Sequence, residues 1–210
     1  MKINKHLFED IKNSDSKILA VTKYWDLEQI KEFFDGLNEE YFDLIIGLWE
    51  NRVNSLKEKN LDREQTHFIW NVQTKEIKHI IKYCDTIHSI DNEKHIKKIE
   101  DICEKSDTWM KIFLQIKLDE SKPWWIGISE IPKFLELIDN CENVSLVWFS
   151  AIWKAEFTEE EKIEEFKILK ELRNKYIPNW LVSAWTSRDY KIAIKQDIDI
   201  IRIWRGLINK

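Results

Sequence analysis

The chain has 210 residues, of which 43% are hydrophobic and 34% are charged, so it can bury a core of domain size. Its formal net charge is −5 and its basic residues are dispersed, which excludes the basic stripe of a nucleic-acid-binding protein. No apolar run reaches the roughly 20 residues that span a bilayer, and the first residues lack the apolar stretch of a secretory signal. We expect one cytoplasmic domain, residues 1–210, without nucleic-acid or membrane partners.

Eight apolar segments rich in β-forming residues follow one another along the chain. We expect them to be strands, with the bounds Lys17–Lys23, Phe42–Leu48, Thr66–Trp70, Thr86–Ile90, Met110–Leu118, Ser145–Ile152, Leu181–Ala184 and Ile200–Ile203. Apolar residues with helical spacing lie between some of them, at Ile30–Leu37, Ile77–Ile81 and Ile131–Ile138. Thr158 and Glu161 form a capping box that opens a further helix over residues 159–176.

This alternation predicts an α/β fold. Near-continuous apolar strands suit a parallel sheet that is covered on both faces. Repeated βα units imply right-handed crossovers between parallel strands. Eight units predict a single-domain (β/α)8 barrel of the TIM type, and a doubly wound open sheet is the alternative.

In such barrels the functional groups lie at the carboxyl ends of the strands, often with a phosphate site after strands 7 and 8. This rule selects Lys23 after the first strand, together with polar residues that follow later strands: Glu50, Asn51, Gln73, Thr74, Ser183, Thr186, Ser187, Arg202, Arg205 and Gly206. A desolvated lysine there can form a Schiff base with an aldehyde. For a lone lysine, a solvated strand end is the commoner outcome.

The two segments SAWTSRDY and IRIWRGL each predict the start of a helix. Two helix N-termini directed at one point form an anion site, although two capped helices without a ligand are an equally good interpretation. The histidines lack metal-ligand spacing, so no metal site is expected, and we interpret His67 as structural. Cys84, Cys103 and Cys141 lack CxxC spacing and are typical of free thiols in a reducing compartment.

Motifs along the whole chain resemble those of one family. ILAVTK, LWENRV, THFIWNVQTKEIK, TIHSID, FLQIKLDESK, FSAI, SAWTSRDYKIAI and IIRIWRGLI occur in the order found in the pyridoxal phosphate homeostasis proteins, which are single-domain relatives of the alanine racemase N-terminal barrel. The resemblance implies pyridoxal 5′-phosphate as the cofactor and a role in vitamin B6 balance without assigned turnover. It also implies a monomer or weak dimer, with pyridoxal-phosphate-dependent enzymes as possible clients.

The resemblance assigns roles to individual residues. Lys23 matches the lysine that carries the cofactor as a Schiff base, Arg202 the arginine beside the pyridine nitrogen, and Asn51 an asparagine near the cofactor. The phosphate-holding segments contribute the remaining matches, which are Ser183, Thr186, Ser187, Arg205 and Gly206. Trp204 lies in the same segment and is also expected at the cofactor site, although it departs from the family's residue.

Tryptophan replaces glycine at several family positions, namely Trp49, Trp70, Trp185 and Trp204. The chain has 4 Gly and 11 Trp, whereas about 7% Gly is usual. An indole at Trp185 or Trp204 would fill the space where the backbone should approach the phosphate. We hypothesise that these codons are UGA, which some bacterial lineages translate as glycine; a genuinely Trp-rich chain is the alternative.

Two other functions stay open at this point. The first is an amino-acid racemase of the same barrel type, which would need a second domain and a second catalytic base. The second is a barrel that has lost the cofactor and serves as an interaction protein. Visible absorbance with added pyridoxal phosphate discriminates the cofactor-free barrel from the others.

Overall fold

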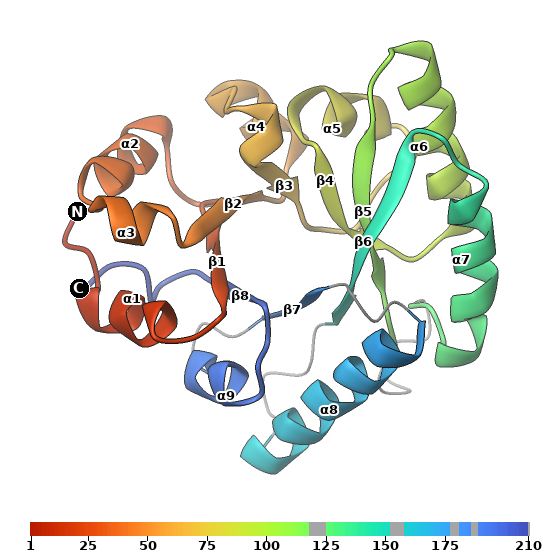
Figure 1. Ribbon diagram of the computed structural model, residues 1–210. Coiled ribbons are helices and arrows are strands. Elements are labelled where there is room, and N and C mark those ends of the chain that lie inside the picture. The colour runs from red at the N-terminus through yellow and green to blue at the C-terminus, as the bar shows by residue number, and fades with distance from the viewer. Residues whose placement is uncertain (118–124, 152–157, 177–180, 186–188, 210) are drawn as a thin grey trace. The chain divides into compact units, whose positions relative to one another are not determined.

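The structure is a computed structural model that describes residues 1–117, 125–151, 158–176, 181–185 and 189–209 (Figure 1). Its strands close into a barrel in chain order, which confirms the (β/α)8 fold and excludes the open sheet. The strands are β1 (Lys17–Val21), β2 (Ile45–Glu50), β3 (Thr66–Phe68), β4 (Thr86–Ile90), β5 (Met110–Gln115), β6 (Val144–Ala151), β7 (Leu181–Trp185) and β8 (Ile200–Ile203).

Helices precede, connect and flank these strands. They are α1 (Lys5–Lys12), α2 (Leu27–Asp35), α3 (Glu39–Phe42), α4 (Val53–Lys59), α5 (Ile77–Tyr83), α6 (Glu93–Lys105), α7 (Ile131–Asp139), α8 (Glu159–Tyr176) and α9 (Tyr190–Lys195), with short 3-10 helices at η1 (Arg63–Gln65) and η2 (Ile128–Glu130). Among the described residues, no helix is long and apolar enough to cross a membrane.

The chain divides into two compact units. The first consists of Met1–Trp49 and Ile152–Lys210, and the second of Glu50–Ala151. The first therefore contains β1, β7, β8 and most of β2, and the second contains β3 to β6. That residues 1–210 act as one domain stays a prediction.

In the first unit, β1 lies between β2 and β8. Ala20 pairs with Leu48 of β2 and with Ile203 of β8, both in parallel register. Residues 18–21 of β1 are buried, as the apolar run ILAV predicts. The carboxyl ends of β1, β2 and β8 therefore meet at one edge of this unit.

The segment after β8 is not the helix that the IRIWRGL motif predicts, and this expectation is wrong. Residues 204–207 form a turn, and Ile208 makes an antiparallel bridge with Ile3. The Leu207 carbonyl accepts a hydrogen bond from the Asn4 amide at 3.1 Å, and the Asn209 amide donates to the Lys2 carbonyl at 2.8 Å. Pairing with the first residues of the chain uses backbone groups that a helix would need.

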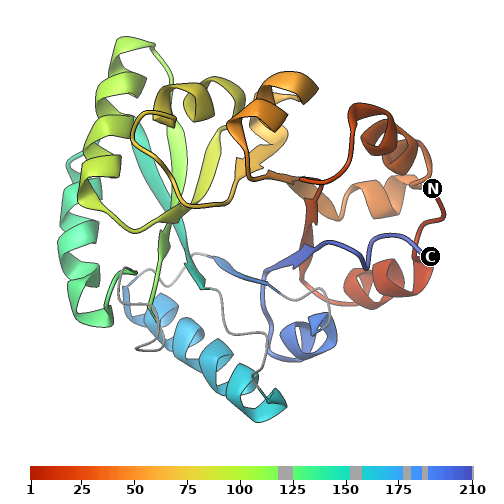
Figure 2. The ribbon, with the colours of Figure 1, turned by 180° about the vertical axis from the view of Figure 1, so that it is seen from behind.

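In the second unit, β4 pairs with β3 and β5, and β5 pairs with β6, all in parallel. Figure 2 shows α6 and α7 side by side along the outside of β5 and β6. Their inward faces are apolar: Ile96, Ile99 and Cys103 of α6 and Phe134 and Ile138 of α7 are buried.

At two places a local capping signal moves an element end away from its predicted position. β2 begins at Ile45 because Asn38 caps α3, its side chain accepting from the Tyr41 amide at 2.8 Å. α2 ends at Asp35 with Gly36 as its C-cap, so Leu37 lies outside the helix. The capping box of α8 is confirmed: Thr158 and Glu161 exchange hydrogen bonds of 2.7 and 3.2 Å.

Candidate functional site

Lys23 lies two residues beyond β1, in a tight turn that leads to α2. The Thr22 amide donates to the Trp49 carbonyl of β2 at 3.2 Å, which extends the strand pairing by one residue. The Trp25 amide then donates to the Thr22 carbonyl at 2.8 Å, and Asp26 begins α2 with a capping box. Lys23 is thus held between a strand end and a helix start, and its side chain is half-buried.

Aromatic rings surround the Lys23 amine. Its Nζ lies 5.1 Å from the ring centre of Trp49, 5.2 Å from that of Tyr24 and 5.8 Å from that of Trp204. The Tyr24 and Trp204 rings also contact each other, with centres 4.9 Å apart. Such faces attract a cation by about 0.5–1 kcal/mol each at exposed sites and more when desolvated. Tyr24 adjoins Lys23 in the sequence, yet the strand-end rule does not select it.

Arg202 lies on β8 beside β1, where it pairs with Leu19. Its side chain is fully buried, and its Cζ is 5.8 Å from the Trp49 ring centre. Burial lowers the pKa of the guanidinium to about 9, which still leaves it charged at neutral pH. Lys23 and Arg202 therefore both lie within 6 Å of the Trp49 indole.

The predicted phosphate residues are only partly described. Thr186 and Ser187 lie outside the described residues. Ser183 lies in the middle of β7 with a buried hydroxyl that has no hydrogen-bond partner among the described residues. Arg205 is exposed, with its Cζ 4.3 Å from the Trp204 ring centre.

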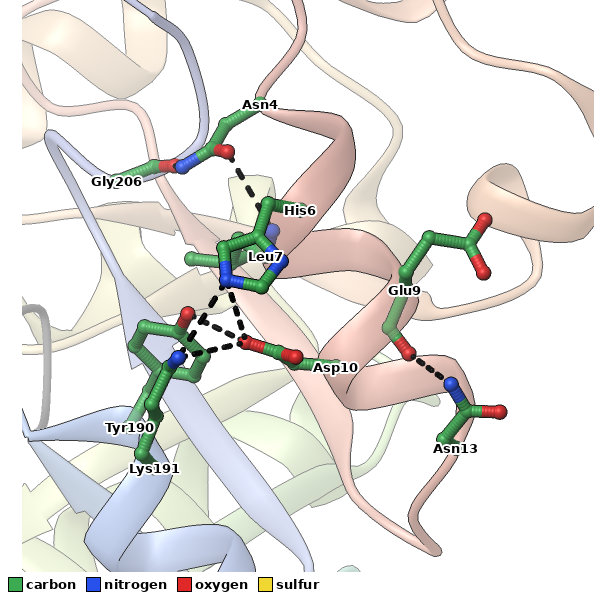
Figure 3. A network of polar contacts seen from close by, with 9 residues as sticks. All are labelled: Asn4, His6, Leu7, Glu9, Asp10, Asn13, Tyr190, Lys191 and Gly206. Carbon is green, nitrogen blue, oxygen red and sulfur yellow. Dashed lines mark hydrogen bonds and ion pairs between the residues drawn. The ribbon is translucent and has the colours of Figure 1, made fainter.

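Gly206 is fixed from the first residues of the chain. Asn4 Nδ2 donates to the Gly206 carbonyl at 2.9 Å, while Asn4 Oδ1 caps α1 by accepting from the Leu7 amide at 3.4 Å (Figure 3). One asparagine thus ties the start of α1 to the turn after β8.

The helix after β7 is fixed to α1 as well. Tyr190, the first residue of α9, donates its hydroxyl hydrogen to Asp10 Oδ2 at 2.7 Å, and Lys191 Nζ lies 3.5 Å from the same oxygen (Figure 3). Burial and this hydrogen bond raise the pKa of Tyr190 to about 12. Asp189, directly before α9, forms an ion pair with Lys162 at 3.1 Å. The N-terminus of α9 therefore already has a carboxylate beside it.

In the second unit, Asn51 directly follows β2 and is half-buried. Glu50 is fully buried and binds Lys59 of α4 through Oε1 at 2.7 Å and Ser55 through Oε2 at 2.8 Å. The sequence selects Glu50 only as a strand-end residue, because its spacing to Lys59 carries no signal of this ion pair. Gln73 and Thr74 are exposed beyond β3, and Trp70 is also exposed.

His67 forms a buried pair with His88. Its Nδ1 lies 2.7 Å from His88 Nε2, and the His88 ring stacks on Phe113 with centres 3.6 Å apart. Burial lowers the pKa of His67 to about 4, so it is neutral at physiological pH. In the described part of the chain, no three His, Cys, Asp or Glu side chains could hold a metal ion.

A comparison with known proteins finds a curated relative of this chain. The pyridoxal phosphate homeostasis protein of Aquifex aeolicus is 22% identical over 194 residues, which cover 90% of this chain and 84% of the relative. No family model matches the chain.

Solved structures show the same fold. PipY of Synechococcus elongatus, solved with PLP bound, has a TM-score of 0.78 at 18% identity and covers 98% of both chains. The same protein without PLP has a TM-score of 0.80 at 19% identity. An alanine racemase of Clostridium difficile has a TM-score of 0.71 at 14% identity, and the match spans 98% of this chain but 58% of the racemase. The chain thus resembles the pyridoxal phosphate homeostasis proteins along nine tenths of its length, as its motifs indicated, and has the barrel fold of PipY and alanine racemase.

Proposed function

We propose that this protein binds pyridoxal 5′-phosphate through a Schiff base on Lys23 and serves in intracellular pyridoxal phosphate homeostasis. The observation that carries the proposal is the placement of Lys23 and Arg202 around one indole, at the meeting of β1, β2 and β8. The Aquifex relative named for this role, and PipY with PLP bound, support it.

The described residues fit this cofactor in three respects. Lys23 supplies a half-buried amine at the carboxyl end of a barrel strand. Arg202 supplies a buried cation that would lie beside the pyridine nitrogen and, by like-charge repulsion, keep that nitrogen unprotonated. The Ser183 hydroxyl, buried without a partner in the described part of the chain, is available for an oxygen of the ligand.

Pyridoxal phosphate, when bound, would supply an aldehyde that combines reversibly with a neutral amine, with loss of one water on attachment and uptake of one water on release. Lys23 would hold the cofactor in this way only after giving up its ammonium proton. Such reversible attachment suits a carrier that delivers the cofactor to client enzymes. We propose that the phosphate is held by Arg205, Gly206, Thr186 and Ser187, and that it approaches the backbone near Trp204. Asn51 is proposed to lie near the cofactor.

Borohydride reduction followed by peptide mapping tests the attachment. Incubation with pyridoxal phosphate should give a visible absorbance, and reduction should place the pyridoxyl group on Lys23. The variant Lys23→Ala should lose both signals. Lys17→Ala is the matched control, because Lys17 is the first residue of β1 and so lies at the end of the strand opposite to Lys23, and this variant should keep both signals.

Label on a different lysine would overturn the assignment of Lys23. Absence of absorbance at saturating cofactor would instead favour the cofactor-free barrel.

A further inference from the structure

A groove lies on the outer surface of the second unit, between α5 and α6. Its volume is about 510 Å³. The apolar lining consists of Ile81 and Ile102, and the polar lining consists of Arg63, Lys78, His79, Lys82, Ser106 and Thr108. Arg63 precedes β3 and Thr108 precedes β5, so the groove faces the amino-terminal ends of the strands. This is the side opposite to the strand ends at which the functional groups of such barrels lie.

The groove is positively charged in a chain whose net charge is −5. Arg63, Lys78 and Lys82 are basic side chains, and none of the described lining residues is a carboxylate. The C-terminal ends of α5 and α6 each contribute about half a negative charge at most. Three cations therefore exceed what the two helix ends can neutralise, and a surplus is left for an anion.

Arg63 is held in place by the protein. Its Nε donates to the Ile81 carbonyl at 2.9 Å, and its Nη2 donates to the Trp109 carbonyl at 2.7 Å. Nη1 makes no hydrogen bond to the described residues. A guanidinium fixed in this way loses little side-chain entropy when it binds an anion through its remaining N–H groups.

The chemistry of the lining defines the ligand. Binding sites for small molecules are mostly apolar, with a few polar groups that orient the ligand. Here Ile81 and Ile102 supply the apolar surface and the basic side chains supply the charge. We propose that this groove binds a small organic anion, with its apolar body against the two isoleucines and its phosphate or carboxylate on Arg63, Lys78 and Lys82.

Calorimetry on the full chain with 1-naphthyl phosphate as the probe tests the proposal. The double variant Lys78→Glu/Lys82→Glu should weaken binding at least about tenfold, because it removes two ion pairs and introduces repulsion. Lys94→Glu/Lys97→Glu changes the net charge equally on the exposed face of α6 and should leave the affinity unchanged. Equal loss in both variants, no loss in the first, or no binding to the parent chain would overturn the proposal.

Two partial probes test the two halves of the ligand. Inorganic phosphate has the charge without the apolar body, and 1-naphthol has the apolar body without the charge. Each should bind at least about tenfold more weakly than the whole probe. If inorganic phosphate bound as tightly as 1-naphthyl phosphate, the groove would be a simple anion site. If 1-naphthol did so, the groove would be a simple apolar crevice. Either result would overturn the proposal. In all of these measurements the parent chain and its variants carry Lys23→Ala, so the outcome does not depend on the proposed Schiff base.

Discussion

At the scale of single residues, the rings around Lys23 favour the charged form of its amine. A Schiff base forms from the neutral amine, so Trp49, Tyr24 and Trp204 oppose the reaction that we propose for Lys23. Of these rings, Trp204 is only half-buried, so we expect its removal to leave the core intact. Trp49 is fully buried, so its removal would leave a cavity.

Trp204→Gly should therefore strengthen pyridoxal phosphate binding. One cation–π contact is worth roughly 1 kcal/mol, which corresponds to about fivefold in affinity, and the freed space adds to this. Absorbance titration measures the effect. Trp109→Gly, at an exposed tryptophan of the second unit, should leave the affinity unchanged. If Trp204→Gly binds pyridoxal phosphate no better than the parent chain, the indole does not obstruct the site. The hypothesis that UGA is translated as glycine has a separate test in the gene: TGG codons at the family-glycine positions would end it.

The buried His67 makes stability depend on pH. Its pKa is about 4 in the folded chain and about 6.5 when exposed, so between these values the unfolded chain binds more protons. Stability should be fully present above pH 6.5 and fall as the pH drops toward 4, by on the order of 3 kcal/mol. Urea unfolding from pH 7 to 4.5 measures this loss. His67→Gln should reduce the pH dependence, whereas the exposed His79→Gln should leave it unchanged. Part of the slope should persist in His67→Gln, because burial also lowers the pKa of His95; equal slopes in the two variants would refute the role of His67.

At the scale of elements, the strands could be predicted better than the segments that connect them. β4 and β8 have the predicted bounds, and every residue of both strands is buried, as expected of parallel strands that are covered on both faces. The segment after β8 could not be predicted, because its conformation depends on bonds to residues about 200 positions earlier. Lys23 and Arg202 followed from the strand-end rule and the family motifs, but the rings around Lys23 depend on side-chain packing that spacing does not reveal.

Asn4 links two elements, and its loss should affect both. Asn4→Ala removes the cap of α1, at a cost of about 0.5–2 kcal/mol, and frees the Gly206 carbonyl. We expect a lower melting temperature and weaker retention of pyridoxal phosphate. Asn13→Ala is the control, because Asn13 lies exposed at the other end of α1 and its side chain donates to the Glu9 carbonyl at 2.9 Å (Figure 3). Equal effects of both variants on cofactor retention would contradict a role for Asn4 in holding the turn.

At the scale of the whole molecule, the eightfold alternation of strands and helices favoured barrel closure over an open sheet, and the structure confirms closure. Sequence periodicity sets each βα unit, and the right-handed crossover rule leaves few ways to connect eight of them. The division into two compact units has no counterpart in the sequence. No Pro-rich or Gly-rich linker marks Trp49 or Ala151, since the first boundary falls within β2 and the second at the end of β6.

The pairing of β1 with β8 has a consequence for the order of folding. Lys17 and Ile200 are about 180 residues apart, whereas Thr86 of β4 and Lys111 of β5 are about 25 apart. Each doubling of a loop adds about 0.6 kcal/mol of closure entropy, so the β1–β8 seam costs roughly 2 kcal/mol more to form than a neighbouring pair. We expect this seam to close late, and Arg202 to reach the neighbourhood of Lys23 only then. A nascent or partly folded chain would carry the lysine without the arginine, and would hold the cofactor poorly until the ring of strands is complete.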